Sequence, residues 1–205
     1  MPIAALRAAG AVLAAVGLLL GVVAATYAAR LGGDGTATFR LASPDAPVVV
    51  GPSLLARVDA PVSVTATAER GAAWLGVASA SDASAVVGAA SHQRVTGVSL
   101  TAWTAQGATE GSGATVDAAR LDRSDVWLLE KTGSRSVTVT LQPQEPPAAV
   151  VAAAQEGALR SVTVSWQHGR WAALAWGSLA LALALLAGGA ALLWRARPAR
   201  TGEGR

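Results

Sequence analysis

The stretch AALAWGSLALALALLAGGAALLW, residues Ala172–Trp194, contains no charged side chain over 23 consecutive positions. A helix of this length spans about 34 Å at a rise of ~1.5 Å per residue, which exceeds the ~30 Å hydrocarbon core of a bilayer. Buried helices of soluble proteins usually carry shorter apolar runs, of roughly 10–14 residues. Trp176 and Trp194 lie near its two ends, as is typical of membrane interfaces. The sequence therefore predicts a transmembrane helix over residues 172–194.

A second apolar run lies near the N-terminus, where Ala8–Ala29 is uncharged for 22 residues. It is longer than the core of a cleaved signal peptide, which has roughly 7–15 apolar residues, and it is long enough to span a bilayer. The small residues Val23–Ala25 would suit a signal-peptidase site, so cleavage stays open as the alternative. We favour an uncleaved signal anchor over residues 8–29.

The positive charges decide the orientation that we expect. Arg195, Arg197, Arg200 and Arg205 follow the second span directly, and basic residues flanking a span favour the cytoplasmic side. Both termini are then cytoplasmic. We therefore expect five segments: cytoplasmic residues 1–7, a span over 8–29, an extracytoplasmic domain over 30–171, a span over 172–194 and a cytoplasmic Arg-rich tail over 195–205.

Composition excludes several classes of function. The chain has no Cys, so disulfides and thiol chemistry are excluded, and two His give little support for a transition-metal site. The net charge is +3, but the segment between Leu31 and Gly169 holds nine basic and twelve acidic residues, a balance that argues against nucleic-acid binding. We expect no cofactor. The absence of Asn and the single Lys131 indicate a high-G+C genome, as in actinobacteria.

The segment between the two spans shows strand periodicity. Val62–Arg70, Ser136–Gln142 and Ser161–Trp166 alternate apolar residues with Ser and Thr, which is typical of strands with one buried face. Further strands are predicted at Thr36–Leu41, Pro47–Val50, Ala73–Ala78, Val95–Trp103, Asp125–Lys131 and Ala148–Ala154. A short helix is predicted over Ser81–Ala90, capped by Ser81 or Asp82. About nine short strands predict an antiparallel β-sandwich of jelly-roll or immunoglobulin-like type.

Three stretches resemble a family of uncharacterised actinobacterial two-pass membrane proteins with a β-rich extracytoplasmic domain. They are LGVASASD with ASAVVGAA and SHQRVTGVSL, then DVWLLEKTGSRSVTVTLQ, then AAVVAAAQEGALRSVTVSW. Val86–Val87 stands where that family usually has an aromatic-Leu pair, and AAAQEGA where it has MNADG. The resemblance implies the same layout of helix, β-rich domain and helix, and it implies no assigned activity.

Two residues are candidates for a ligand or partner surface. His92 follows the predicted short helix, where it could bind a ligand or respond to pH, or could contact the last helix carbonyls. Trp103 could belong to the core, or could form an exposed aromatic platform for a sugar or a partner protein, because Val98, Leu100 and Ala102 alternate onto the other face. The acidic residues Asp117, Asp122, Asp125 and Glu130 match no calcium-loop spacing.

Small residues recur at four-residue spacing in both apolar runs. Gly17 and Gly21 lie one turn apart in the first, and Ala180, Ala184 and Gly188 do so in the second. Such spacing lets helix backbones approach closely, so it predicts that the two helices pack together.

The sequence favours a cell-envelope membrane protein without catalytic activity, whose outer domain binds, scaffolds or assists another component. Besides the lipid bilayer, its expected partners are a membrane protein or the cell-wall glycan. One alternative is an envelope glycan hydrolase that uses carboxylates from residues 117–130. Another is a sensor subunit that couples binding outside to the membrane helices of a partner.

Overall fold

The computed structural model describes residues 3–42, 44–116, 118–143 and 148–197. The chain divides into two compact units, one made of Met1–Thr36 with Gly169–Arg205, the other of Ala37–His168. Each unit is described by itself.

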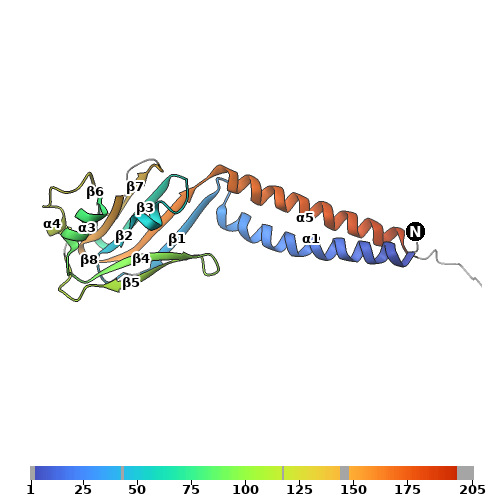
Figure 1. The fold of residues 1–205 in the computed structure, drawn as a ribbon, viewed down its shortest axis with the longest axis horizontal. Coiled ribbons are helices and arrows are strands. Elements are labelled where there is room, and N and C mark those ends of the chain that lie inside the picture. The colour runs from blue at the N-terminus through green and yellow to red at the C-terminus, as the bar shows by residue number, and fades with distance from the viewer. Residues whose placement is uncertain (1–2, 43, 117, 144–147, 198–205) are drawn as a thin grey trace, which may run out of the picture. The chain divides into compact units, whose positions relative to one another are not determined.

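The first unit is a pair of long helices that run antiparallel and side by side (Figure 1), α1 (Ile3–Leu31) and α5 (Gly169–Arg195). The predicted spans over residues 8–29 and 172–194 lie inside these helices. Both helices are long and apolar enough to cross a membrane. Their large apolar side chains point outward: Leu19 is 70% exposed and Leu174 is 67% exposed.

Small residues line the contact between these helices, at a spacing of seven. In α1 the buried positions include Gly10, Gly17 and Ala24, and in α5 they include Ala175, Ala182 and Gly189. A seven-residue repeat keeps one narrow face of each helix against its neighbour, as in a coiled coil. The predicted pairing of the two helices therefore occurs, and the predicted Gly17 and Gly21 both face α5, while the fully buried positions of both helices recur every seven residues.

Within the described residues, the second unit is built on a mixed sheet of eight strands, five of which close into a ring. The ring runs β1 (Thr36–Ala42), β5 (Thr104–Glu110), β4 (His92–Ser99), β2 (Val48–Val50) and β8 (Ala148–Gln167), and β8 pairs again with β1. The pairs β1–β5 and β2–β4 are parallel, and β4–β5 and β2–β8 are antiparallel. The β-rich core is thus a small five-stranded barrel.

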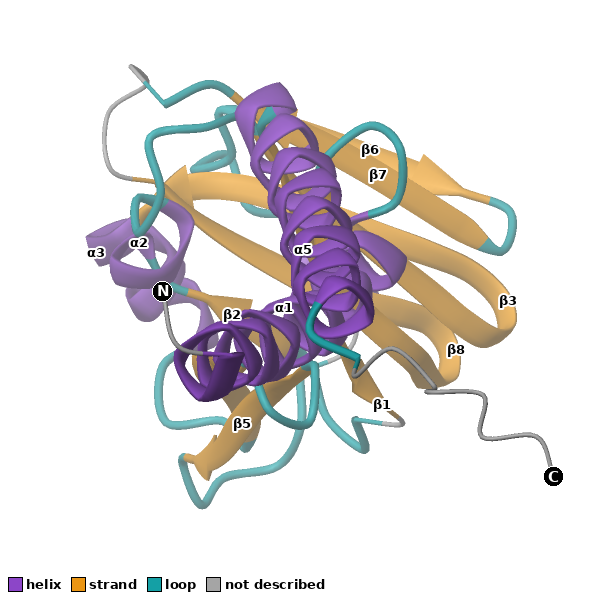
Figure 2. Ribbon diagram, turned by 90° about the vertical axis from the view of Figure 1, so that its right-hand side faces the viewer, coloured by secondary structure: helices purple, strands orange, loops and turns teal. Residues whose placement is uncertain are grey.

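The other three strands extend this barrel from β8. The longest pairing joins β8 to β3 (Val62–Ser79), from the partners Val62 and Trp166 to the partners Ser79 and Ala148. Its register shifts between Thr67 and Ala73, where β3 bends. On the other side of β3 lie β7 (Ser136–Leu141) and β6 (Leu129–Gly133), one after the other along its length (Figure 2).

The structure corrects the predicted antiparallel sandwich in three ways. The sheet closes on itself through β1, which pairs with both β5 and β8, and it contains parallel pairs. Four predicted strands are really two continuous ones, β3 and β8. The strand β5 was not predicted, because TAQGATE has neither strict alternation nor β-branched enrichment. Alternation itself could not separate sandwich from barrel, since both bury one face of each strand.

The predicted alternation is nevertheless confirmed strand by strand. Val64 on β3, Val139 on β7 and Val164 on β8 are fully buried and share one face of the sheet. On the opposite face Ser and Thr hydroxyls bond across the strands, Thr65 to Thr138 at 2.8 Å being one such pair. This period-two pattern fixes the register, because a slip of one residue would put hydroxyls in the core.

Three short helices of the described residues pack against β8: α2 (Pro52–Leu55), α3 (Ala80–Val87) and α4 (Ala118–Leu121). Leu121 packs there with Trp74 and Trp127, whose rings meet edge to face at 5.0 Å. The Ser79 hydroxyl accepts the Asp82 amide hydrogen at 3.1 Å and so caps α3, which begins one residue before the predicted helix. The predicted caps Ser81 and Asp82 are therefore corrected to Ser79.

Candidate functional site

His92 begins strand β4, and its ring is almost completely buried. Its Nδ1 lies 2.9 Å from the Ala90 carbonyl oxygen. A carbonyl only accepts, so Nδ1 carries the hydrogen and donates it, and a neutral ring then has a lone pair on Nε2. Oε2 of Glu110 lies 3.6 Å from Nε2. Because α3 ends at Val87, Ala90 lies beyond it, and the contact with the Ala90 carbonyl is not the predicted one with the last helix carbonyls.

The carboxylate of Glu110 also accepts a hydrogen bond from the guanidinium of Arg94. The distance from Nε of Arg94 to Oε2 of Glu110 is 2.7 Å, a charge-assisted hydrogen bond. This bond is the largest influence on the carboxyl group, and it lowers the pKa of Glu110 below its ordinary value. Because His92 and Glu110 are direct partners in the β4–β5 register, the pleat itself places the three side chains together.

The turn after Glu110 holds the His92 end of the hairpin in place. The amide of Gly113 donates to the carbonyl of Ala89 at 2.9 Å, and the Ser91 amide donates to the carbonyl of Gly113 at 3.1 Å. Gly111 has φ +74° and lies so close to the Ala90 carbonyl that a side chain there would collide with it. The carbonyl that receives the His92 hydrogen bond is therefore fixed by backbone contacts.

Trp103 lies at the other end of the same hairpin, in the turn between β4 and β5. Its ring is half-buried and stacks on Phe39 with 5.0 Å between centroids, and Phe39 in turn meets Trp166 edge to face at 5.8 Å. Trp103 has φ +57°, a left-handed conformation that is a genuine outlier for a bulky residue and costs of order 1–3 kcal/mol. The structure thus places Trp103 between the two predicted alternatives, partly packed and partly open.

The two candidate residues are not brought together. His92 pairs with Glu110 at one end of the hairpin, and Ser99 pairs with Thr104 at the other. About seven residues of strand separate the ends, or roughly 23 Å at ~3.3 Å per residue. We therefore treat the His92 cluster and the Trp103 turn as two separate sites.

The acidic stretch beyond α4 forms a turn. Asp117 lies outside the described residues, while Asp122 and Asp125 are exposed. Burial, followed by the nearby charge of Asp122, raises the pKa of Glu130 above its ordinary value. Across the described parts of the chain, no group of three or more His, Asp or Glu side chains is placed to hold a metal ion.

The predicted helix-packing residues divide between two faces. Gly17 contacts the backbone of α5 at Leu186 and Ala182, and Gly21 faces the side chain of Ala182. Ala180, Ala184 and Gly188 lie on the exposed face of α5. A Cβ on Gly188 would meet nothing within 4 Å. The prediction that these three residues pack against α1 is therefore wrong. The contact residues of α5 are instead indicated by small residues that recur every seven positions.

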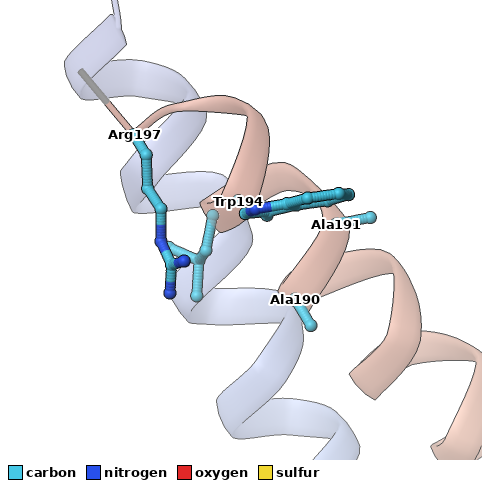
Figure 3. Close-up of a pocket in the computed structure, with 5 residues that line it drawn as sticks. Ala190, Ala191, Trp194 and Arg197 are labelled. Carbon is cyan, nitrogen blue, oxygen red and sulfur yellow. The ribbon is translucent and has the colours of Figure 1, made fainter. Parts of the chain in front are cut away.

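A shallow hollow lies on the last turns of α5, lined by Ala190, Ala191, Leu193, Trp194 and Arg197 (Figure 3). Trp194 is 71% exposed, and its ring lies across this part of the helix. An exposed Trp beside an Arg at the end of an apolar helix is typical of the headgroup region of a membrane.

Sequence reasoning missed three residues that matter at these sites. Arg7 donates from Nε and one terminal nitrogen to the Ala196 carbonyl, at 3.1 and 2.9 Å, and so caps the C-terminal end of α5. Phe39 had a usable signal, since it is the single Phe in the chain. Glu110 had none, because its pairing with His92 depends on the unpredicted strand β5.

No protein-family model matches the chain, and no curated protein matches it significantly. Among solved structures, the crystal structure of hydroquinone 1,2-dioxygenase from Sphingomonas sp. TTNP3 with 4-hydroxybenzoate bound is similar at 12% sequence identity and a TM-score of 0.27. The similarity covers 65% of this chain and 59% of that chain, less than two thirds of its length. A TM-score this low supports no inference about fold or activity.

Proposed function

We propose that the chain is a two-pass membrane protein whose extracytoplasmic β-domain binds another membrane protein as an accessory module, without catalytic activity. Residues 8–29 and 172–194 cross the bilayer, and both termini are cytoplasmic. The observation that carries the binding role is the open edge of strand β6 beside the exposed Leu128 and Leu129.

The arrangement of charges supports this topology. Arg7, Arg195 and Arg197 lie at the same end of the antiparallel helix pair, since Arg7 bonds to Ala196 directly after α5. Positive residues next to a span favour the cytoplasmic side. Arg7 also satisfies one of the carbonyls left unpaired at the C-terminal end of α5.

The binding role rests on strand β6. Within the described part of the chain, β6 pairs with β3 alone and ends the sheet, so its outer edge carries free backbone groups. Leu128, directly before it, is 73% exposed although its amide is fixed to the Val77 carbonyl at 2.8 Å, and Leu129 is 38% exposed. An open edge flanked by rigidly held apolar side chains suits the addition of an extended segment from a partner protein.

Most of the polar groups described for this domain are engaged within the fold. Arg94 and Glu110 bond to each other, His92 bonds to a carbonyl through Nδ1, and the Trp127 ring N–H donates to the Leu121 carbonyl at 2.8 Å. Nε2 of His92 is buried without a hydrogen-bond partner among the described residues. An exposed apolar edge remains as the feature that a partner would recognise.

Topology is tested by single cysteines in a chain that has none of its own. We expect Ser134→Cys, in the exposed turn between β6 and β7, to react with a membrane-impermeant maleimide on intact cells. A cysteine added after Arg205 should react only after permeabilisation. Labelling of both positions, or of the tail alone, on intact cells would contradict the proposed orientation.

The binding role is tested by co-purification from native membranes in mild detergent, with a tag after Arg205. We expect a stoichiometric membrane-protein partner with the natural chain, and its loss when Leu128 and Leu129 are both changed to Asp. Thr109→Asp is the control, because Thr109 is exposed on β5 and belongs neither to the β6 edge nor to the β4–β5 turn. A partner retained by the double variant, or none with the natural chain, would overturn the proposal.

A further inference from the structure

We propose that the β4–β5 turn, residues 100–103, is a membrane-contacting element that rests its apolar side chains in the lipid headgroup region next to the two spans. This goes beyond the partner-binding role, and it rests on the proposed topology only in requiring that α1 and α5 cross the bilayer. The surface that this turn contacts is that of the lipid bilayer.

The strand register places this turn at the end of the barrel from which the chain enters and leaves. Strand β5 is parallel to β1, and its first residue Thr104 pairs with Arg40. Strand β1 begins at Thr36, five residues after the last residue of α1. The turn that precedes Thr104 therefore lies level with the first half of β1, toward the residues that connect it to α1.

The aromatic contacts give the same position independently. Trp103 stacks on Phe39, and Phe39 meets Trp166, near the end of β8. Trp166 precedes the first residue of α5 by three residues, a reach of at most about 10 Å for an extended chain. The ring of Trp103 is thus tied through two ring contacts to a residue that precedes the second apolar helix by three positions in the chain.

The chemistry of the turn fits an interface between lipid and water. Residues Leu100, Thr101, Ala102 and Trp103 carry no charge, and Leu100 is 59% exposed. Trp is favoured at the headgroup level because its ring is apolar and its N–H is polar. The exposed Arg40, directly beside Thr104, adds a positive charge that suits lipid phosphates.

Strain at Trp103 agrees with a turn shaped for contact. A left-handed conformation is unusual for a large side chain, and such outliers gather at functional positions. Here the conformation sets the Trp103 ring against Phe39, while the turn leaves the Leu100 side chain in the open. The stack therefore supports a short apolar tip that ends in Leu100.

The test uses single-cysteine variants carrying an environment-sensitive nitrobenzoxadiazole label. Leu100→Cys is compared with Leu128→Cys, which is also well exposed but lies beside Val77, near the end of β3 that pairs with Ala148. The full chain is reconstituted into vesicles of phosphatidylcholine and phosphatidylglycerol, with or without lipids that carry a headgroup spin label. Because the quencher occupies both leaflets, either orientation of the protein reports on the contact.

We expect spin-labelled lipid to quench the label at position 100 at least twofold more than the label at position 128. Equal quenching at the two positions would overturn the proposal. A label at position 100 that is shielded from water in native membranes but not in pure lipid vesicles would also overturn the proposal. Such a result would assign the turn to a protein partner. The vesicles contain no partner, so this result is independent of the co-purification experiment on Leu128 and Leu129.

Discussion

Gly10 of α1 and Gly189 of α5 meet backbone to backbone. A Cβ on Gly10 would lie 3.0 Å from the carbonyl oxygen of Gly189, and a Cβ on Gly189 would lie 2.8 Å from the carbonyl oxygen of Gly10. In a membrane, helices associate mainly through close packing of this kind, because lipid removes the hydrophobic driving force between them. The spacing of the helix pair therefore depends on the absence of side chains at a few identifiable positions.

Gly189→Leu is expected to separate the two helices, whereas Gly188→Leu is not. Gly188 faces open space, with nothing within 4 Å of a Cβ. Both variants replace one glycine of the same helix by leucine, so they have identical composition and hydropathy. The readout is a disulfide between Gly21→Cys and Ala182→Cys, whose Cβ positions are 3.6 Å apart, a distance suited to disulfide formation. We expect at least a fivefold loss of disulfide yield with Gly189→Leu, and equal yields in the two variants would contradict the assigned contact.

Gly76→Ala is expected to destabilise the β-domain by about 1–3 kcal/mol, as overpacking of a core does. A Cβ at this position on β3 would lie 2.7 Å from the Trp127 ring and would also collide with Trp74. The control is Gly97→Ala on β4, where the nearest atom is 3.6 Å away. Thermal unfolding of the full chain in detergent, followed by near-UV circular dichroism, compares the two, and a larger loss at Gly97 would refute the packing argument.

The helix pair shows how much of this molecule can be predicted from its sequence. The two apolar runs followed from length and composition and their pairing from the recurrence of small residues, and the seven-residue repeat of Gly10, Gly17 and Ala24 was also readable. Ala and Gly are so frequent in these runs that four-residue spacings also occur, and only the contact itself decides between the repeats. The buried faces of β3, β7 and β8 were equally predictable, because alternation is a local property.

Closure of the barrel and the two candidate sites were not predictable, since each depends on pairing between distant residues. His92 acquires Glu110 as a neighbour only through the β4–β5 register, and Trp103 acquires Phe39 only because β1 and β5 are parallel. The left-handed backbone of Trp103 has no sequence signal, because such positions are usually Gly, Asn or Asp.

Glu110→Gln is expected to flatten the acid limb of the stability curve. The Arg94 hydrogen bond lowers the pKa of Glu110 in the folded state, so this carboxylate contributes stability that is present above its unfolded value, near 4.5, and is lost as the pH falls through the folded value. The melting temperature of the natural chain should therefore fall between about pH 5 and pH 3, and that of the variant should fall less. The midpoint measured at half-unit pH steps checks this, and parallel curves would contradict the role of the pair.

Glu130→Gln provides a control of opposite sign. Burial raises the pKa of Glu130 in the folded state, so its contribution is fully present at pH values below the unfolded value and is lost as the pH rises through the folded value. Removing this carboxylate should raise the melting temperature at pH 7 and leave it nearly unchanged at pH 3. A lower melting temperature at pH 7 would show that the Glu130 carboxylate has a favourable partner in solution.

Trp103→Gly is expected to be more stable than Trp103→Ala, by about 1 kcal/mol. Both variants lose the stack on Phe39, so their difference isolates the backbone. At an ordinary φ, Ala is the more stable residue because Gly loses more conformational entropy on folding. At φ +57° the order reverses, since a Cβ costs roughly 1–2 kcal/mol in the left-handed region and Gly avoids that cost. Unfolding of the two full-length variants in detergent decides the point, and an Ala variant as stable as the Gly variant would mean that the turn relaxes when the ring is removed.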